Sequence, residues 1–210
     1  MTPGARIAAA IEILDAWQDG KAAEQALTSW ARRSRFAGSK DRAAIRDLVF
    51  DCLRNLRADT LASGAIWGQQ TSGRALMIGA CQRMGADFDA LFSGEGHAPH
   101  ALSDEEKHAL CAPDPAIINL PDWLMDKFQN ALGEKAEEQM KLLIDRAPIS
   151  IRANTQQVST SGLAETLSEN DIETRANPLS PAALTVVSNP RRLGQTQADR
   201  KSTRLNSSHP

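Results

Sequence analysis

The sequence predicts a mainly α-helical protein with a small α/β part toward its C-terminal end. Its 210 residues are rich in alanine and leucine and only 4% aromatic, a composition that favours helices. Apolar residues within 39–57 recur at i, i+3, i+4 and i+7, the period of a helix with one buried face. After Pro148 the period changes to the alternation of a strand, with apolar side chains at Ile149, Ile151 and Ala153.

Two helices are predicted at the N-terminal end. The first carries an apolar stripe from Ile7 to Trp17 and ends at Gly20, because glycine readily adopts the left-handed conformation of helix ends. The second continues to about residue 36 and ends in a cluster of three arginines, Arg32, Arg33 and Arg35.

The helix over residues 39–57 gives the strongest signal, and Ser39 is a suitable N-cap for it. At ~100° per residue, four arginines lie within an arc of about 120° beside its apolar face. Phe50 shares that arc. Guanidinium groups pair with phosphates in a bidentate manner, so this arginine stripe is a candidate phosphate-binding surface. The alternatives are a solvated face or ion pairs with the acidic part of the chain. The stripe consists of Arg42, Arg46, Arg54 and Arg57.

Charge is unevenly distributed along the chain, although the net charge is only −2. Residues 32–57 contain eight Lys or Arg against three Asp or Glu. Residues 84–145 contain four Lys against thirteen Asp or Glu. The net charge predicts no polyanionic partner, whereas the distribution places a basic element beside an acidic one.

A further helix is predicted over residues 71–84, followed by a loose stretch rich in Gly, Pro and His. Ser103 and Glu106 then have the spacing of a capping box for a short helix. This region also holds a His-x2-His and a His-x2-Cys pair, which are residue types that zinc favours. The same spacing is common in exposed loops, so we assign no metal site to His97, His100, His108 and Cys111.

Residues 120–155 join the helical part to the α/β part. Pro121 suits the first turn of a helix that ends near Gly133, and a second amphipathic helix follows. In the strand after it, Arg152 and Asn154 leave on the same face, where they can hold a phosphate or a base edge. The alternative roles are a contact at a domain interface or satisfaction of backbone groups at the strand end.

Beyond this strand, a helix is predicted around residues 163–167 and a second strand around residues 184–186. The last twelve residues, DRKSTRLNSSHP, are polar and lack a helical or strand period. They resemble translated sequencing-adapter read-through. We therefore interpret residues 199–210 as a non-native, disordered tail and leave them out of the fold prediction.

The remaining features indicate a monomeric, cytoplasmic protein with no membrane association. The three cysteines are widely spaced and form no CxxC pair, which favours a reduced chain over a disulfide scaffold. The N-terminus lacks a signal-peptide core, and no apolar run approaches the length of a membrane span. Cys52 falls on the apolar face of its helix, where a buried structural thiol is expected.

Residues 120–155 resemble the RsmB/NOP (Sun-type) family of RNA cytosine-C5 methyltransferases. That family shows a Leu-Pro-x-Trp-Leu helix, a glycine shortly after it, a second helix ending in Ala-Pro, and an Arg-x-Asn strand. The run Ser39-Lys40-Asp41-Arg42 and its helix look like the NusB-like RNA-binding fold found at the N-terminus of the family. In residues 120–155 the matching positions are Leu120, Pro121, Trp123, Leu124, Gly133, Ala147, Pro148, Arg152 and Asn154.

The resemblance implies a domain organisation for the chain. A NusB-like helical bundle would occupy residues 1–118, a helical linker residues 119–148, and a partial, incomplete ferredoxin-like α/β subdomain residues 149–198. This is the non-catalytic front part of the family. The family's glycine-rich S-adenosylmethionine loop, its acidic ribose-binding residues and its two catalytic cysteines are absent from this sequence.

The resemblance therefore implies an RNA-binding part of a ribosomal RNA (cytosine-C5) methyltransferase. S-adenosylmethionine would serve the catalytic domain, and we expect this chain to bind no cofactor and to be inactive alone. The alternatives are a NusB-like, non-catalytic antitermination-type factor and a helical protein-interaction scaffold. The expected RNA-contacting residues are Arg32, Arg33, Arg35, Arg42, Arg46, Arg54, Arg57, Arg152 and Asn154.

Overall fold

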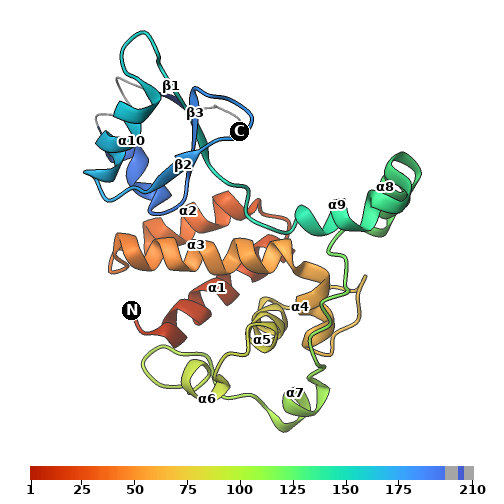
Figure 1. Ribbon diagram of the computed structural model, residues 1–210. Helices are drawn as coiled ribbons and strands as arrows, with labels where there is room; N and C mark the ends of the chain where they lie inside the picture. Colours follow the sequence, from red (N-terminus) through yellow and green to blue (C-terminus); the bar gives the residue numbers. More distant parts are fainter. Residues whose placement is uncertain (197–202, 206–210) are drawn as a thin grey trace. The chain divides into compact units, whose positions relative to one another are not determined.

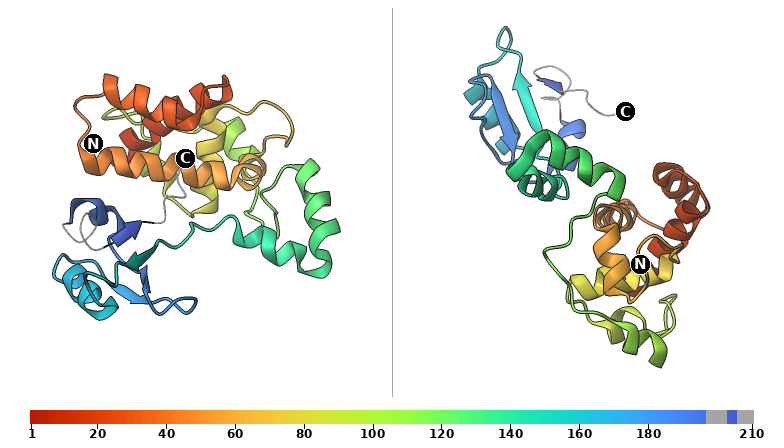
Figure 2. Two further views of the ribbon diagram at one scale, coloured as in Figure 1. Left: turned by 90° about the horizontal axis from the view of Figure 1, so that it is seen from above. Right: turned by 90° about the vertical axis from the view of Figure 1, so that its right-hand side faces the viewer.

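The computed structural model describes residues 1–196 and 203–205 (Figures 1 and 2). The chain divides into two compact units, Met1–Asp145 and Arg146–Pro210. The first unit is a helical bundle and the second is a small α/β unit, which confirms the predicted fold class. Among the described residues, none of the helices combines the length and apolarity needed to cross a bilayer.

The helical unit is built around α1, which packs against α2, α3 and α5 (Figure 1). Its core contains Ile13, Leu14, Ile45, Leu76 and Met77, each no more than 1% exposed. The elements are α1 (Pro3–Gln18), α2 (Ala23–Arg33), α3 (Ser39–Arg54), α4 (Leu56–Ala62), α5 (Gly73–Arg83), α6 (Phe88–Leu91), α7 (Asp104–Ala109), α8 (Asp122–Leu132), the 3₁₀ helix η1 (Gly133–Lys135) and α9 (Ala136–Leu142).

The helix predicted over residues 39–57 is divided in two. Asn55 adopts φ −106° and ψ 25°, and its side chain donates a hydrogen bond to the backbone oxygen of Asp51 at 3.0 Å. The chain then turns into α4, so Arg57 no longer shares a straight helix with Arg42. An asparagine competes for the backbone groups of its own helix in this way, which is why it favours helix ends.

One predicted helix start is correct, and two are shifted by one residue: Pro121, predicted in the first turn of its helix, is the N-cap of α8. The capping box of Ser103 and Glu106 is present in full at α7. Gly38, rather than Ser39, is the N-cap of α3, and it provides no side-chain hydrogen bond. Gly133 ends α8 with φ +55°, as predicted for a glycine at a helix C-terminus.

The α/β unit is a four-stranded antiparallel sheet in the order β2-β3-β1-β4. With α10 between β1 and β2, this is the ferredoxin-like split β-α-β arrangement. The unit is incomplete in one respect: between β3 and β4 the described residues form a 3₁₀ helix in place of the second helix. The elements are β1 (Ser150–Ala153), α10 (Thr160–Ser168), β2 (Thr174–Ala176), β3 (Ala183–Val186), the 3₁₀ helix η2 (Pro190–Gln195) and β4 (Thr203–Leu205).

The helix α10 packs on the sheet and forms a separate core with it (Figure 1). Ile151 of β1 lies opposite Leu184 of β3 and is 1% exposed, while Leu163 and Leu167 of α10 are fully buried. Because side chains alternate along a strand, the exposed Arg152 lies on the face of β1 opposite this core.

The expectation that the last twelve residues lack regular structure is wrong for Thr203–Leu205. These residues form β4 and pair antiparallel with β1, with Ala153 opposite Thr203. Without them β1 would be an edge strand with a row of unpaired backbone groups. Residues 199–202 and 206–210 of the predicted tail lie outside the described residues.

Candidate nucleic-acid interface

A groove of about 220 Å³ lies between α2 and α3, and two arginines of the predicted stripe line it. Arg42 and Arg46 are both exposed, whereas Ile45 between them is fully buried and anchors α3 in the core. The Nε of Arg42 donates a hydrogen bond to the backbone oxygen of Ala37 at 2.9 Å. No carboxylate pairs with Arg42 within the described part of the chain.

Arg46 is partly neutralised by α2. Its guanidinium group forms a bidentate pair with Glu24, with Nη1 at 2.9 Å from Oε2, and lies 5.3 Å from the centre of the Phe50 ring. Both side chains of the pair are about half exposed, at 53% and 55%. An exposed pair of this kind stabilises by at most about 1 kcal/mol, so a phosphate can replace the carboxylate.

Arg54 and Arg57 are held by acidic side chains, in accord with the alternative role for the stripe. Arg54 Nη2 lies 3.5 Å from Asp51 Oδ1. The side chain of Arg57 is only 14% exposed; it pairs with Asp122 of α8 and stacks 4.6 Å from the centre of the Trp67 ring. Arg57 therefore ties α4 to α8 and is not part of one continuous stripe with Arg42 and Arg46.

The three arginines at the end of α2 fall into two groups. Arg33 pairs with Glu12 of α1. Arg32 and Arg35 are exposed and form no hydrogen bond or ion pair with any residue that the structure describes. These two guanidinium groups are therefore available to an anionic partner.

Arg152 and Asn154 line one polar hollow of about 540 Å³ at the end of β1, as their spacing predicts. Arg152 is exposed and has no partner among the described residues. Asn154 begins the turn after β1, where its Oδ1 accepts a 3.4 Å hydrogen bond from the backbone N–H of Gln156. Ser180 and Ala182, from the turn before β3, complete the wall of this hollow.

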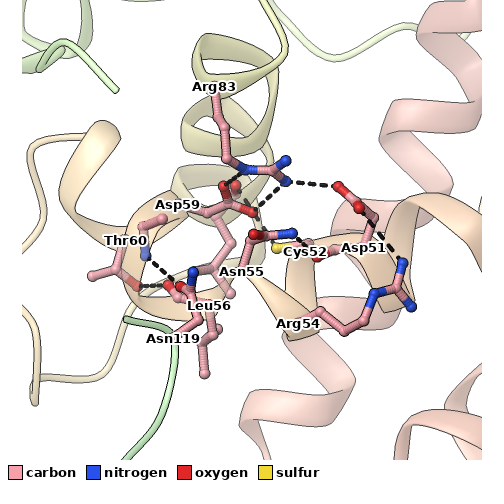
Figure 3. A network of polar contacts seen from close by, with 11 residues as sticks. Asp51, Cys52, Arg54, Asn55, Leu56, Asp59, Thr60, Arg83 and Asn119 are labelled. Carbon is pink, nitrogen blue, oxygen red and sulfur yellow. Dashed lines mark hydrogen bonds and ion pairs between the residues drawn. The ribbon is translucent and has the colours of Figure 1, made fainter. Parts of the chain in front are cut away.

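The most buried polar cluster of the helical unit was not predicted from the sequence (Figure 3). Arg83 of α5 points between two carboxylates: its Nε lies 2.6 Å from Asp59 Oδ1, and its Nη2 lies 2.6 Å from Asp51 Oδ2 and 3.2 Å from Asp59 Oδ2. Asp59 is fully buried. The cluster joins α3, α4 and α5, which places it inside the bundle and away from the arginines that remain free.

Burial and hydrogen bonding act in opposite directions on the two main charges of this cluster. Burial raises the pKa of Asp59 to about 6, although the hydrogen bond from Arg83 acts in the opposite direction. Burial also acts to lower the pKa of Arg83, but its hydrogen bonds to Asp59 and Asp51 outweigh it, so the pKa is raised. Arg83 and Asp59 are thus both charged at neutral pH, which makes the cluster a structural ion pair.

One residue in the sequence, Gly79, could have indicated the helix crossing that forms this cluster. A glycine inside a helix weakens it and therefore marks a close approach of another backbone. A Cβ added to Gly79 would lie 1.7 Å from the backbone oxygen of Asp59. Gly79 thus allows α4 to cross α5 at the position that brings Asp59 to Arg83.

The two buried thiols of the bundle are poor nucleophiles. Burial raises the pKa of the Cys52 thiol, and the nearby Asp59 carboxylate adds to the effect. Burial likewise raises the pKa of the Cys81 thiol to about 12. Both residues are fully buried, as predicted for Cys52. Structural thiols with raised pKa values are inert.

The histidine-containing stretch is held by Arg74. This arginine binds both oxygens of Glu106, at 2.7 and 2.9 Å, and the backbone oxygens of His100 and Ala101. His108 bonds the backbone oxygen of Asp104 through Nδ1 at 2.6 Å. Within the described residues, no group of three or more His, Cys, Asp or Glu side chains is arranged to hold a metal ion.

Comparisons with known proteins identify one domain of the chain. The family model described as Methyltr_RsmF/B-like, ferredoxin-like domain matches residues 120–191, which take in α8, α9, α10 and β1 to β3. A search of the curated proteins found no match.

Among solved structures, the crystal structure of PH0851 is similar to this chain with a TM-score of 0.57 and 17% sequence identity. The similarity covers 98% of this chain and 53% of PH0851, so the chain spans about half the length of that protein. At this identity the likeness concerns the fold. The family model shows that residues 120–191 are similar to the ferredoxin-like domain of RsmF/B-like methyltransferases, which confirms the resemblance in residues 120–155.

Proposed function

We propose that this chain positions RNA for an RsmB/NOP-type, S-adenosylmethionine-dependent cytosine-C5 methyltransferase domain, with ribosomal RNA as the substrate. The sequence contains none of the cofactor-binding or catalytic motifs of that reaction, so the chemistry belongs to a separate catalytic domain. In this role the chain binds the RNA backbone and presents it, and the S-adenosylmethionine is bound elsewhere.

The observation that carries the proposal is the hollow beside Arg152. It lies within the domain matched by the methyltransferase family model, and it combines an unpaired guanidinium with the side chain of Asn154. An arginine can hold a phosphate, and an amide can donate and accept hydrogen bonds at a base edge. Arg32, Arg35 and Arg42 in the helical unit provide further positive charge without an acidic partner in the described structure.

The same match argues against a free-standing NusB-like factor. Such a protein has no use for a ferredoxin-like domain that follows its helical bundle. A protein-interaction scaffold likewise gives no reason for an unpaired arginine and an asparagine at the end of β1.

RNA binding measured as a function of salt tests the proposal. Each phosphate contact contributes a slope of roughly 0.7 to log Kd against log salt for a single strand. Arg152→Gln should weaken binding of a ribosomal RNA fragment at low salt and flatten this slope by about one contact. Arg192→Gln is the matched control, because Arg192 lies in the same unit but pairs with Asp171 at 2.5 Å.

The two arginine groups of the helical unit allow the same comparison. The double variant Arg32→Gln/Arg35→Gln should flatten the slope by about two contacts, roughly 1.4 for a single strand. Arg33→Gln, which removes an arginine paired with Glu12, should change it less. Absence of salt-dependent binding in the wild-type chain would refute the proposed function.

A further inference from the structure

An aromatic side chain is exposed in the middle of the free positive charge of the helical unit. Phe36 lies in the turn between α2 and α3, and 76% of it is exposed. Trp123, another exposed aromatic residue of this unit, is 65% exposed, but the ammonium group of Lys127 lies 5.6 Å from the centre of its ring. No such contact is formed by Phe36 within the described structure, so its ring faces are open.

The turn around Phe36 is fixed at both ends. Ser34 and Ala37 are 8% and 3% exposed, and the N–H of Ala37 donates to the oxygen of Ser34 at 3.0 Å. The Nε of Arg42 donates to the oxygen of Ala37 at 2.9 Å and fastens the turn to α3. Two buried residues thus flank Arg35 and Phe36, and these hydrogen bonds fix the backbone that carries the two exposed side chains.

The neighbours of Phe36 are cationic. Arg32, Arg35 and Lys40 are exposed and have no partner among the described residues. The acidic residue nearest in sequence, Asp41, pairs with Arg6 at 2.9 Å, and the hydrogen bond from Arg6 lowers the pKa of Asp41. The turn therefore presents an exposed aromatic ring that has unpaired cations on both sides of it in the sequence.

This combination distinguishes between classes of partner. Aromatic residues and arginine are both common at protein–protein interfaces, but a protein partner would have to supply a carboxylate for each of these cations, because desolvating an unpaired charge is costly. Single-stranded nucleic acid supplies both kinds of group in one repeating unit: a base face for the ring and phosphates on either side of it for the cations. A duplex offers no free base face to the ring, since its bases already stack on each other.

We propose that Phe36 stacks on an unpaired base of single-stranded RNA while Arg32, Arg35 and Lys40 contact the flanking phosphates. The groove between α2 and α3 begins beside this turn, where Arg42 both lines the groove and holds the turn. This inference rests on the proposed function and specifies its substrate as unpaired RNA.

The test uses the full chain and two probes, a fluorescein-labelled single-stranded oligoadenosine RNA and an RNA duplex of the same length. Phe36→Ala should weaken binding of the single strand by about five- to 150-fold, the range measured when one stacking aromatic is removed. It should leave duplex binding and the salt slope unchanged, because every positive charge remains. Phe36→Trp should retain binding, and Trp123→Ala is the control with an exposed aromatic away from the free arginines.

A second readout separates stacking from apolar contact. With 2-aminopurine in the single strand, the wild type and Phe36→Trp should quench its fluorescence, and Phe36→Ala and Phe36→Leu should not. Equal binding and quenching by Phe36→Leu would overturn the stacking role. Unchanged affinity of Phe36→Ala for a strand that the wild type binds would overturn the inference and leave the proposed function intact. Failure of the wild type to bind either probe would overturn both.

Discussion

Removal of the Arg83 side chain should destabilise the helical unit far more than removal of a neighbouring arginine. In Arg83→Met, Asp59 loses hydrogen bonds of 2.6 and 3.2 Å while remaining fully buried. Breaking a buried pair by deleting one partner costs about 3–5 kcal/mol, because the other charge stays without compensation. Methionine retains most of the apolar length of arginine, so the lost charge accounts for most of the effect.

The matched control is Arg54→Met. Arg54 shares the Asp51 carboxylate with Arg83, but its contact is 3.5 Å long and both partners are about one-third exposed. We expect a cost of no more than about 1 kcal/mol. A unit of this size loses about 2–4 °C in Tm for each kcal/mol, so Arg83→Met should lower Tm by roughly 6–20 °C.

The assay can follow the helical unit alone. All four tryptophans, Trp17, Trp30, Trp67 and Trp123, lie within Met1–Asp145, so urea unfolding followed by tryptophan fluorescence reports on that unit. Adding Asp59→Asn to Arg83→Met should recover part of the loss, because a neutral amide costs less to leave buried than a carboxylate. Equal free energies of unfolding for Arg83→Met and Arg54→Met would refute this account of the cluster.

Two further predictions concern the same helix crossing. Burial raises the pKa of Asp59 from an ordinary value near 3.8 to about 6. Asp59 therefore contributes stability that is fully present below about pH 4 and lost as the pH rises through about 6, a change of about 3 kcal/mol. Asp59→Asn should remove this contribution, and a pH profile of unfolding identical to that of the wild type would contradict it. Gly79→Ala should cost about 1–3 kcal/mol or more, since the new Cβ lies 1.7 Å from the Asp59 oxygen. Gly38→Ala, whose added methyl group meets no atom nearer than 3.8 Å, is the comparison, and equal Tm values would show that α4 and α5 can separate without cost.

The sequence predicts the helical elements well because caps and apolar periodicity lie within the helix itself or directly beside it. The capping box at Ser103 and the alternation of β1 both occur in the structure as the sequence indicates. The strand β2 was missed, since Thr174–Ala176 has no buried residue and forms a strand only by pairing with β3. β4 was missed for the same reason. Its strand conformation comes from pairing with β1, and three residues are too few to show the alternation of apolar and polar side chains that predicts a strand.

The ion pairs of the candidate site could not be predicted from the sequence either, because they also depend on contacts between distant residues. A helical wheel shows which arginines share a face, but not which carboxylates will meet them after folding. Asp122 is 65 residues away from Arg57 in the sequence, and the two form an ion pair. Similarly, Glu12 forms an ion pair with Arg33, and Glu24 forms one with Arg46.

Free charge, rather than total charge, decides where a polyanion can bind. Eight basic residues lie within 32–57, yet four of them pair with acidic side chains after folding, and one of these four, Arg57, is largely buried. The residues left without an acidic partner in the described structure are grouped: Arg32, Arg35 and Lys40 around Phe36, and Arg42 at the adjoining groove. Folding thus pairs four of the eight basic residues and leaves the unpaired ones at and beside one turn, and this is the physical reason to expect RNA there before any other surface of the helical unit.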